Sequence, residues 1–264
     1  MGKDTAISWA HHTFNPWWGC TKIEGSPACD TCYAETFANR VGYGPNPTDV
    51  NKFPIWGADT GRRTFGAKHW NEPLKWSRDA ELSGIMARAF CMSMGDWAEG
   101  RPDQKPHLER LGYTINATLA LYWLMLTKRP QLINKLMPVK NHPRVWQGIT
   151  AERQDWLELR WRHLREVQAA VYWLSIEPMF GALTLPEDFL ALGSRAWVIV
   201  GGESGSRATP IDVAAAIRLK DQCREAGVAF HFKQMSGRTK AQLEDIPPQL
   251  RVRQYPLGIT EGKI

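Results

Sequence analysis

The sequence lacks the long apolar segments that a membrane protein or a secreted precursor would show. Its 264 residues contain no uninterrupted apolar run of about 18, the length that a membrane span needs. The N-terminus, Met-Gly-Lys-Asp-Thr, has no apolar signal-peptide core, and Ala6 stands where a myristoylation pattern requires Ser or Thr. We therefore expect a cytoplasmic protein with no membrane partner.

Cysteine is also scarce, and its five copies are unevenly spaced. A cytoplasmic chain with so few cysteines is not expected to depend on a disulfide framework. Cys20, Cys29 and Cys32 lie in one short segment, whereas Cys91 and Cys223 stand alone. We interpret the two isolated cysteines as small buried hydrophobic residues and the three clustered ones as candidates for chemistry.

The chain has neither a repeat of fixed length nor a low-complexity tract, but short apolar runs recur from about residue 85 onward. Near-continuous apolar runs are typical of strands buried on both faces, as in a parallel sheet. Residues 155–167 and 212–226 have the composition of helices that would connect such strands. The expected strands are residues 7–10, 89–92, 121–126, 145–149, 171–174, 197–200 and 228–232.

Polar or charged residues follow these runs at intervals close to the length of one strand–helix unit. This pattern predicts an α/β fold over residues 1–237, a (β/α) barrel that is incomplete and has about six or seven parallel strands. Because barrel enzymes gather their functional groups at the C-terminal ends of the strands, the residues there become site candidates. The charged ones are Lys128, Glu152, Glu177, Glu203 and Lys233.

Two segments interrupt this pattern. Residues 42–78, with many Gly, Pro, Trp and Arg, predict a long excursion over the barrel mouth, and residues 238–264 predict a C-terminal extension. Basic residues interleaved with aromatic ones suit a nucleic-acid strand, and the net charge of +6 with a pI near 9.1 mildly favours a polyanionic partner. A solvated basic loop is the alternative interpretation. The residues concerned are Arg62, Arg63, Lys68, His69 and Trp70.

The clustered cysteines have the spacing C-x8-C-x2-C, in a loop after the first strand. Three thiolates can hold three irons of a cubane cluster and leave the fourth iron open to a small molecule. A structural zinc site would want four ligands, with His11 or His12 as the fourth, and thiols without a metal are a third interpretation. Ligand count favours a [4Fe-4S] cluster, with the three cysteines as metal ligands and catalytic residues.

Several longer motifs resemble a known family. A cysteine triad after the first strand of a (β/α) barrel is similar to the radical S-adenosylmethionine (radical SAM) superfamily. The superfamily usually has C-x3-C-x2-C, so the first gap is longer here, and Thr31 replaces the usual aromatic residue before the last cysteine. The chain most resembles a phage and prophage family with a three-cysteine motif, through residues 13–22, 29–35, 126–130, 174–178 and 200–205.

The resemblance implies two cofactors, a [4Fe-4S] cluster and S-adenosyl-L-methionine. One electron from a donor such as flavodoxin or ferredoxin would cleave the latter, and the 5′-deoxyadenosyl radical would abstract a substrate hydrogen. The implied contacts to the cofactor are Ser93, Gly95 and Asp96 for the methionine amino group, Tyr33 for the adenine, and Gly201, Gly202 and Glu203 for a close backbone approach.

The remaining charged candidates are assigned by chemistry. Glu152 and Glu177 suit the ribose or amino groups of the cofactor, and Lys128 suits its carboxylate. Arg129 and Lys233, together with Arg62, Arg63 and Trp70 of the excursion, are assigned to the substrate. An internal network of salt bridges is the alternative interpretation of the charged residues.

The function expected from these observations is a radical SAM enzyme, of isomerase or transferase class, that modifies or rearranges a modified nucleobase in phage DNA in the host cytoplasm. Access to the base would require a flipped nucleotide or a single strand. The alternatives are the same chemistry on tRNA, a peptide or a small metabolite, and a zinc-stabilised nucleic-acid-binding protein without catalysis.

Overall fold

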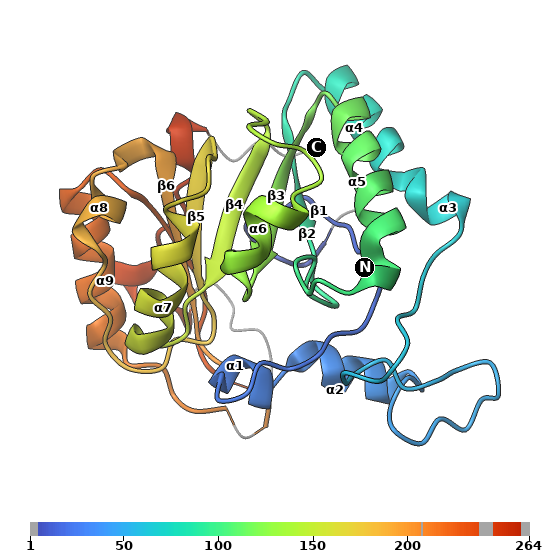
Figure 1. Ribbon diagram of the computed structural model, residues 1–264. Helices are drawn as coiled ribbons and strands as arrows, with labels where there is room; N and C mark the ends of the chain where they lie inside the picture. Colours follow the sequence, from blue (N-terminus) through green and yellow to red (C-terminus); the bar gives the residue numbers. More distant parts are fainter. Residues whose placement is uncertain (1–4, 207, 238–244, 260–264) are drawn as a thin grey trace. The chain divides into compact units, whose positions relative to one another are not determined.

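The structure is a computed structural model that describes residues 5–206, 208–237 and 245–259. These residues divide into two compact units, one within residues 5–144 and the other within residues 145–259. The described residues form seven strands, which follow one another in the sheet in chain order (Figure 1). The predicted fold class, an α/β partial barrel of about seven parallel strands, is confirmed.

The first unit contains three parallel strands, β1 (His12–Thr13), β2 (Ala87–Cys91) and β3 (Leu121–Thr127). Every residue of β2 is buried, as expected of a strand covered on both faces. Helix α4 (Glu72–Leu82) packs against β2 and β3, and also against α5 (Lys105–Ala117). The shorter elements are α1 (Pro27–Asp30), α2 (Tyr33–Arg40), α3 (Ala67–Trp70), η1 (Pro102–Gln104), η2 (Pro130–Leu132) and α6 (Ile133–Leu136).

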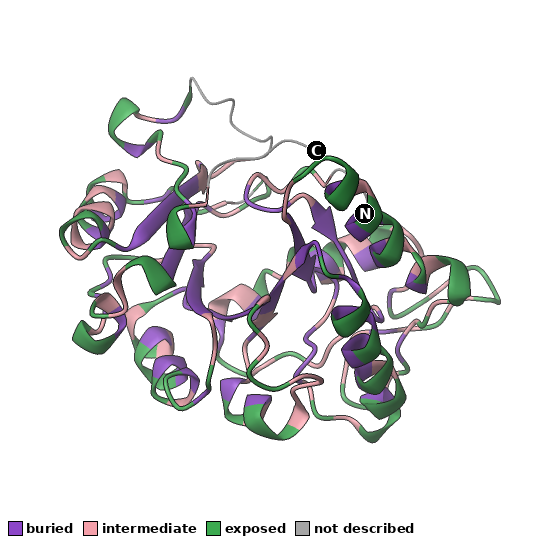
Figure 2. Cartoon of the chain, turned by 90° about the horizontal axis from the view of Figure 1, so that it is seen from above, coloured by how far each residue is buried: buried purple, intermediate pink, exposed green. Residues whose placement is uncertain are grey.

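The second unit contains β4 (Val145–Thr150), β5 (Val171–Ile176), β6 (Ala196–Gly201) and β7 (Ala229–Gln234), each parallel to the next. Every residue of these strands is buried except Lys233 of β7, and Figure 2 shows strands coloured as buried and helices that carry both buried and exposed residues. Burial on both faces explains why the strands read as continuous apolar runs. The helices are α7 (Gln154–Leu164), α8 (Glu187–Leu190) and α9 (Val213–Glu225), with the 3₁₀ turns η3 (Gly193–Arg195), η5 (Pro248–Leu250) and η6 (Pro256–Gly258).

The first strand begins later than the apolar run predicts. It consists of His12 and Thr13 rather than residues 7–10, and Trp9 from that run is buried outside the strand. His12 is a buried polar residue whose ring stacks on Trp76 at 4.5 Å between centroids. A strand made of such residues gives no apolar signal in the sequence.

The excursion at 42–78 is irregular only in its first part, because helix α3 begins at Ala67 and α4 at Glu72. Residues 238–244 and 260–264 of the predicted C-terminal extension lie outside the described residues. The described part of the extension follows β7: Phe232 N–H donates to Val252 O, and Gln254 N–H donates to Phe230 O, each at 2.9 Å.

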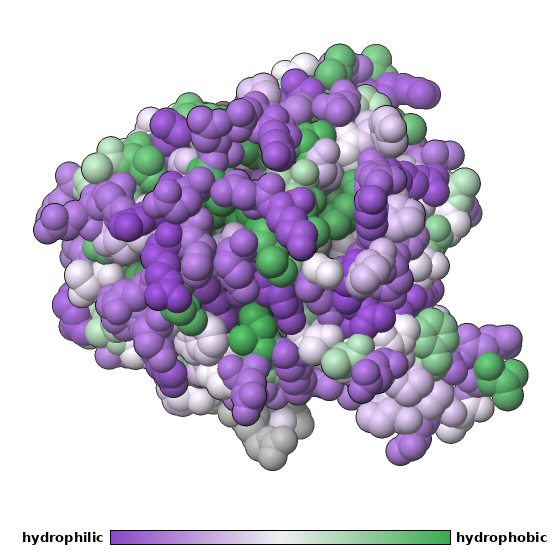
Figure 3. All heavy atoms as spheres, in the orientation of Figure 1, coloured by the Kyte–Doolittle hydropathy of each residue, from purple (hydrophilic) through white to green (hydrophobic). Residues whose placement is uncertain are grey.

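No helix of the described residues has the length and apolarity to cross a bilayer. Hydrophilic residues predominate on the face seen in Figure 3, and hydrophobic ones are scattered among them.

Candidate active site

The loop that carries Cys20 is held on three sides by backbone hydrogen bonds. Gly19 N–H donates to Met94 O at 2.8 Å, beyond the end of β2, and Cys20 N–H donates to Ile55 O at 3.2 Å. The carbonyl of Cys20 accepts from Gly57 N–H at 3.0 Å. The excursion therefore packs on the first cysteine and fixes its backbone.

Gly19 occupies a position that only glycine fits. Its φ is +111°, and a Cβ there would lie 2.2 Å from the carbonyl oxygen of Ile55. The glycine of the Trp-Trp-Gly-Cys motif thus allows the excursion to approach the cysteine closely.

The other two cysteines lie at short helices. Cys29 is buried in α1, and partly exposed Cys32 is the residue that precedes α2. The segment between the first and second cysteines is tied to α2 by an ion pair of 2.7 Å between Lys22 Nζ and Glu35 Oε2. All three thiols are free of disulfides.

The donor set fits an iron–sulfur cluster by its chemistry, since it offers three thiols from one segment. Within the described ranges, no three His, Cys, Asp or Glu side chains are already gathered as a metal site. Binding of a cluster would therefore require the thiols of this segment to come together.

The two histidines considered as a fourth ligand are engaged elsewhere. His11 Nδ1 accepts from the N–H of Arg88 at 2.8 Å, and His12 stacks on Trp76. Neither joins the cysteines in a metal-binding group among the residues described.

Asn15 organises the end of β2, a role that the sequence did not suggest. Its side-chain oxygen accepts from Ser93 N–H at 2.9 Å and from Met94 N–H at 2.8 Å. Tyr33, directly after the last cysteine, donates from its hydroxyl to Ser93 O at 2.9 Å. The predicted cofactor residues Tyr33 and Ser93 are therefore brought together. The only hint in the sequence was a polar Asn inside a buried apolar stretch.

Asp96 is almost fully buried, and both of its oxygens are occupied by protein donors. Oδ1 accepts from Thr127 Oγ1 at 2.6 Å and from Ala98 N–H at 3.0 Å. Oδ2 accepts from Lys128 N–H at 3.1 Å and from Arg129 Nη1 at 2.8 Å. The predicted contact to a methionine amino group is thus replaced by a bond between the ends of β2 and β3.

The electrostatic environment of Cys20 is set by this acid and its partner. Burial first, and then the charge of Asp96, raise the pKa of the Cys20 thiol to about 12, against the lowering effect of Arg129. The thiol is therefore neutral near pH 7, and binding of a metal there must displace its proton.

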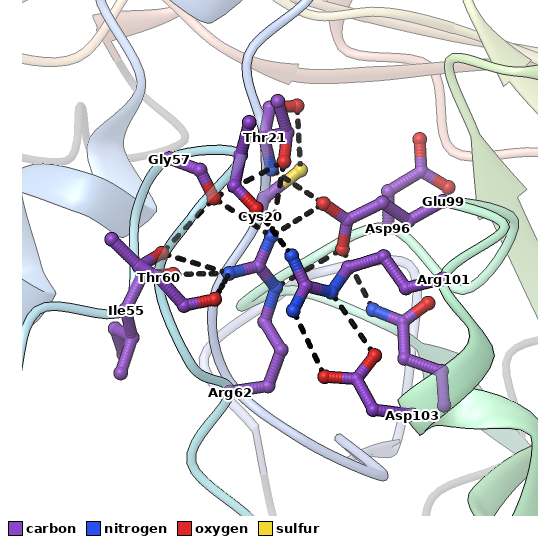
Figure 4. A network of polar contacts seen from close by, with 12 residues as sticks. Cys20, Thr21, Ile55, Gly57, Thr60, Arg62, Asp96, Glu99, Arg101 and Asp103 are labelled. Atoms are coloured by element: carbon purple, nitrogen blue, oxygen red, sulfur yellow. Dashed lines mark hydrogen bonds and ion pairs between the residues drawn. The ribbon is translucent and has the colours of Figure 1, made fainter.

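Arg62 is buried and forms the centre of the network in Figure 4, rather than contacting a substrate. It forms an ion pair of 2.5 Å with Glu99, a residue that the sequence did not single out. The rest of its guanidinium donates to residues of the excursion and to Thr21. Because every donor is used within the protein, the substrate assignment of Arg62 is corrected to a structural one.

Arg63 and Trp70, which the sequence assigned to the substrate, lie in different environments. The guanidinium of Arg63 stacks over Trp18 at 4.3 Å and over Tyr43 and Phe65, each at 4.9 Å. It has no hydrogen bond or ion pair within the described part of the chain. Trp70 is buried, so it is not a surface for base stacking, and the prediction for it is corrected.

In the second unit, Glu177 and Lys233 are brought together. Lys233 Nζ lies 3.3 Å from Glu177 Oε1, and both side chains are partly exposed. Gly201 lies next to this pair: a Cβ there would be 3.1 Å from the same oxygen. Gly202 fits tightly as well, because its Cβ would lie 2.3 Å from the Ser236 nitrogen. A side chain at Gly202 would therefore collide with backbone, whereas one at Gly201 would press only on the Glu177 carboxylate.

Two further acidic candidates, Glu152 and Glu203, interact with other groups of the protein. Glu152 is buried and pairs with buried Arg160 at 2.5 Å, so its assignment to a ribose is corrected to a structural ion pair. Glu203 Oε2 accepts from Thr209 N–H at 2.8 Å.

Lys128 is partly exposed, and its ammonium group has no polar partner among the described side chains. Cys91 and Cys223 are buried, as expected.

Comparison with known proteins gives a family and a fold. The profile of a family described as "Protein of unknown function (DUF5131)" matches residues 4–256. No curated protein matches the sequence. Three solved structures of mutant forms of spore photoproduct lyase are similar, each at 11% identity, with TM-scores of 0.51, 0.54 and 0.53. They cover 87–88% of this chain and 78–80% of their own, and at this identity the likeness establishes the fold alone.

Proposed function

The chain belongs to the DUF5131 family, and we propose that it is a radical SAM enzyme whose [4Fe-4S] cluster is held by Cys20, Cys29 and Cys32. The observation that carries this proposal is a three-cysteine segment placed directly after the first strand of a partial parallel barrel. Spore photoproduct lyase, which has a similar fold, is itself a radical SAM enzyme. When bound, the cluster supplies one electron for the reductive cleavage of S-adenosylmethionine to a hydrogen-abstracting deoxyadenosyl radical.

The chain's own residues would position and shield these groups. Asn15 and Tyr33 fix the backbone at Ser93, where the amino group of the cofactor is expected. The excursion packs on Cys20 through Ile55 and Gly57, which limits the access of water to that side of the cysteine. Lys128, whose ammonium group has no polar partner among the residues described, suits the carboxylate of the cofactor.

For the substrate we propose a nucleobase in DNA, one that already carries a modification in a phage genome. Spore photoproduct lyase is a DNA repair enzyme. The net charge of +6 favours a polyanion, and Arg63 offers a guanidinium that is held by aromatic rings and has no anionic partner in the described structure. A base must leave the helix before a hydrogen on it can be abstracted.

The first test is anaerobic purification followed by reduction in the presence of S-adenosylmethionine. A brown protein with about four irons per chain that releases 5′-deoxyadenosine is expected. A colourless protein with one zinc per chain and no nucleoside product would contradict the proposal and favour a zinc-stabilised binding protein.

The substrate has a separate test. DNA from phage grown with and without the intact gene is digested to nucleosides and compared by mass. A nucleoside that changes mass or retention between the two samples is expected, whereas identical profiles would exclude DNA and direct attention to tRNA, peptides or small metabolites.

A further inference from the structure

Thr21, the residue after the first cysteine, has each of its polar groups held by a charged side chain. Its N–H donates to Glu99 Oε1 at 2.8 Å, and its hydroxyl accepts from Arg62 Nη2 at 3.0 Å. Its carbonyl accepts from Arg129 Nη2 at 2.5 Å. A residue fixed from three sides leaves little freedom to the peptide before it, so these contacts place Cys20. Figure 4 shows Thr21 beside Cys20 within this network.

Arg129 differs from Arg62 because it also faces the sulfur. Its Nη1 lies 3.9 Å from Cys20 Sγ and 2.8 Å from Asp96 Oδ2. The acid is itself fixed by the hydroxyl of Thr127 at 2.6 Å. With one nitrogen on the Thr21 carbonyl and the other between a carboxylate and a sulfur, the planar guanidinium is fully oriented.

A cation that donates to a cysteine sulfur has a defined effect on an iron–sulfur cluster bound there. The reduced cluster carries one more negative charge than the oxidised one, so a nearby positive charge and hydrogen bond stabilise it and raise the reduction potential. We propose that Arg129, oriented by Asp96, is a positioning residue that holds Cys20 and raises the reduction potential of the cluster. This inference rests on the proposed function.

The network also gives the direction of each change. Replacing Arg129 by Gln removes the positive charge and leaves the Asp96 carboxylate unpaired near the sulfur, so the potential becomes more negative. Replacing Asp96 by Asn leaves the guanidinium charge uncompensated and moves the potential the other way. A residue that merely stabilises the fold would produce neither shift.

The test is a potentiometric titration, followed by visible and electron paramagnetic resonance spectra, of the anaerobically purified full chain. Dithionite supplies one electron to each cluster, and dithionite is oxidised. For Arg129→Gln we expect a change of at least tenfold in the reduction equilibrium constant, equal to ~59 mV for one electron, toward more negative potential. Arg129→Lys, which keeps the charge, should recover most of the difference.

Arg101→Gln is the matched control, because it removes the same charge from a guanidinium that pairs with exposed Asp103 and with Ala58 O instead. Its potential should equal that of the wild type. Equal potentials for wild type, Arg129→Gln and Arg101→Gln would overturn the inference. If Arg129→Gln retains no iron, the reduction potential of Asp96→Asn is measured instead. A potential equal to that of the wild type would then also overturn the inference.

If Arg129→Gln and Asp96→Asn both lose their iron while their melting temperatures stay unchanged, Arg129 and Asp96 only hold the cysteine. That result would overturn the claim about the reduction potential. A wild-type protein without any cluster would instead contradict the proposed function. The two failures are therefore distinguishable.

Discussion

Arg160 donates from Nη1 to the carboxylate of Glu152 at 2.5 Å, with both side chains almost completely buried in the second unit. The same nitrogen donates to Thr150 O at 2.8 Å, so helix α7 is fastened to the end of β4. Removing one partner of a buried pair leaves a charge without compensation. We expect Arg160→Met to lower the free energy of unfolding by about 3–5 kcal/mol, measured by urea denaturation.

The exposed pair of Arg153 with Asp155, at the start of the same helix, supplies the control. Arg153→Met should leave the free energy of unfolding nearly unchanged, because exposed ion pairs contribute little. Similar effects of Arg153→Met and Arg160→Met would contradict the structural assignment of Glu152.

Glu99 links the stability of the first unit to pH. Burial alone would raise its pKa, but the hydrogen bonds from Arg62 and Thr21 outweigh burial, and the pKa lies below its ordinary value. A lowered folded-state pKa means that the stabilisation is complete above the unfolded value of roughly 4.3 and is lost as the pH falls through the folded value. Melting temperatures between pH 6 and pH 3 should therefore drop steeply for the wild type.

Glu99→Gln should be less stable than the wild type at pH 6, since Arg62 then lacks its buried partner. On further acidification, however, its melting temperature should fall less than that of the wild type. Glu109→Gln, at an exposed position of α5, should follow the wild-type curve. Parallel curves for Glu99→Gln and wild type below pH 5 would show that this carboxylate is not the group that titrates.

The strands were predictable from the sequence because burial on both faces leaves an uninterrupted apolar run, as in β5 and β6. The first strand was misplaced because His12 and Thr13 are polar, and the ring of His12 stacks on Trp76, which lies far along the chain. Local patterns carry no information about such a partner.

The substrate role predicted for the charged residue Arg62 was wrong for the same reason. Arg62 sits among aromatic and basic residues, a context that suits phosphate binding, yet its partner Glu99 comes from another loop. Pairing between distant segments decides whether a charge faces a ligand or the protein. The position of Glu177 next to Lys233 follows instead from strand ends, which the predicted sheet already placed.

Tyr33 donates a hydrogen bond from its hydroxyl to Ser93 O, and the residue is more than half exposed. Tyr33→Phe keeps the ring and removes this donor. Because the bond holds the backbone where the cofactor is expected, and a hydrogen bond contributes ~1 kcal/mol, the dissociation constant for S-adenosylmethionine should rise about fivefold. Isothermal titration of the reconstituted protein measures this change. Tyr113→Phe, on the exposed face of α5, should leave the affinity unaltered; equal affinities for all three proteins would remove Tyr33 from the cofactor site.

Substitution of any one of the three clustered cysteines should have the same effect, although no metal-binding group is assembled among the residues described. Alanine at Cys20, Cys29 or Cys32 removes one of three ligands, so each variant should lose its cluster and the release of 5′-deoxyadenosine. Iron and sulfide per chain are the measurement. Cys223→Ala, at a buried thiol in α9, should retain both. Full iron content in the Cys29→Ala protein would contradict the ligand set.

Arg63 provides the test of nucleic-acid contact. Its guanidinium is held over Trp18, Tyr43 and Phe65 and has no anionic partner among the described residues, so it can neutralise one phosphate. For single strands, each neutralised phosphate contributes about −0.7 to the slope of log affinity against log salt. Arg63→Gln should therefore weaken binding of a single-stranded DNA and reduce this slope by ~0.7, measured by fluorescence anisotropy at several salt concentrations. Arg78→Gln has the same net charge as Arg63→Gln, but it removes a guanidinium from the exposed face of α4. An equal loss of slope in that variant would mean that general charge, not the stacked guanidinium, attracts the DNA.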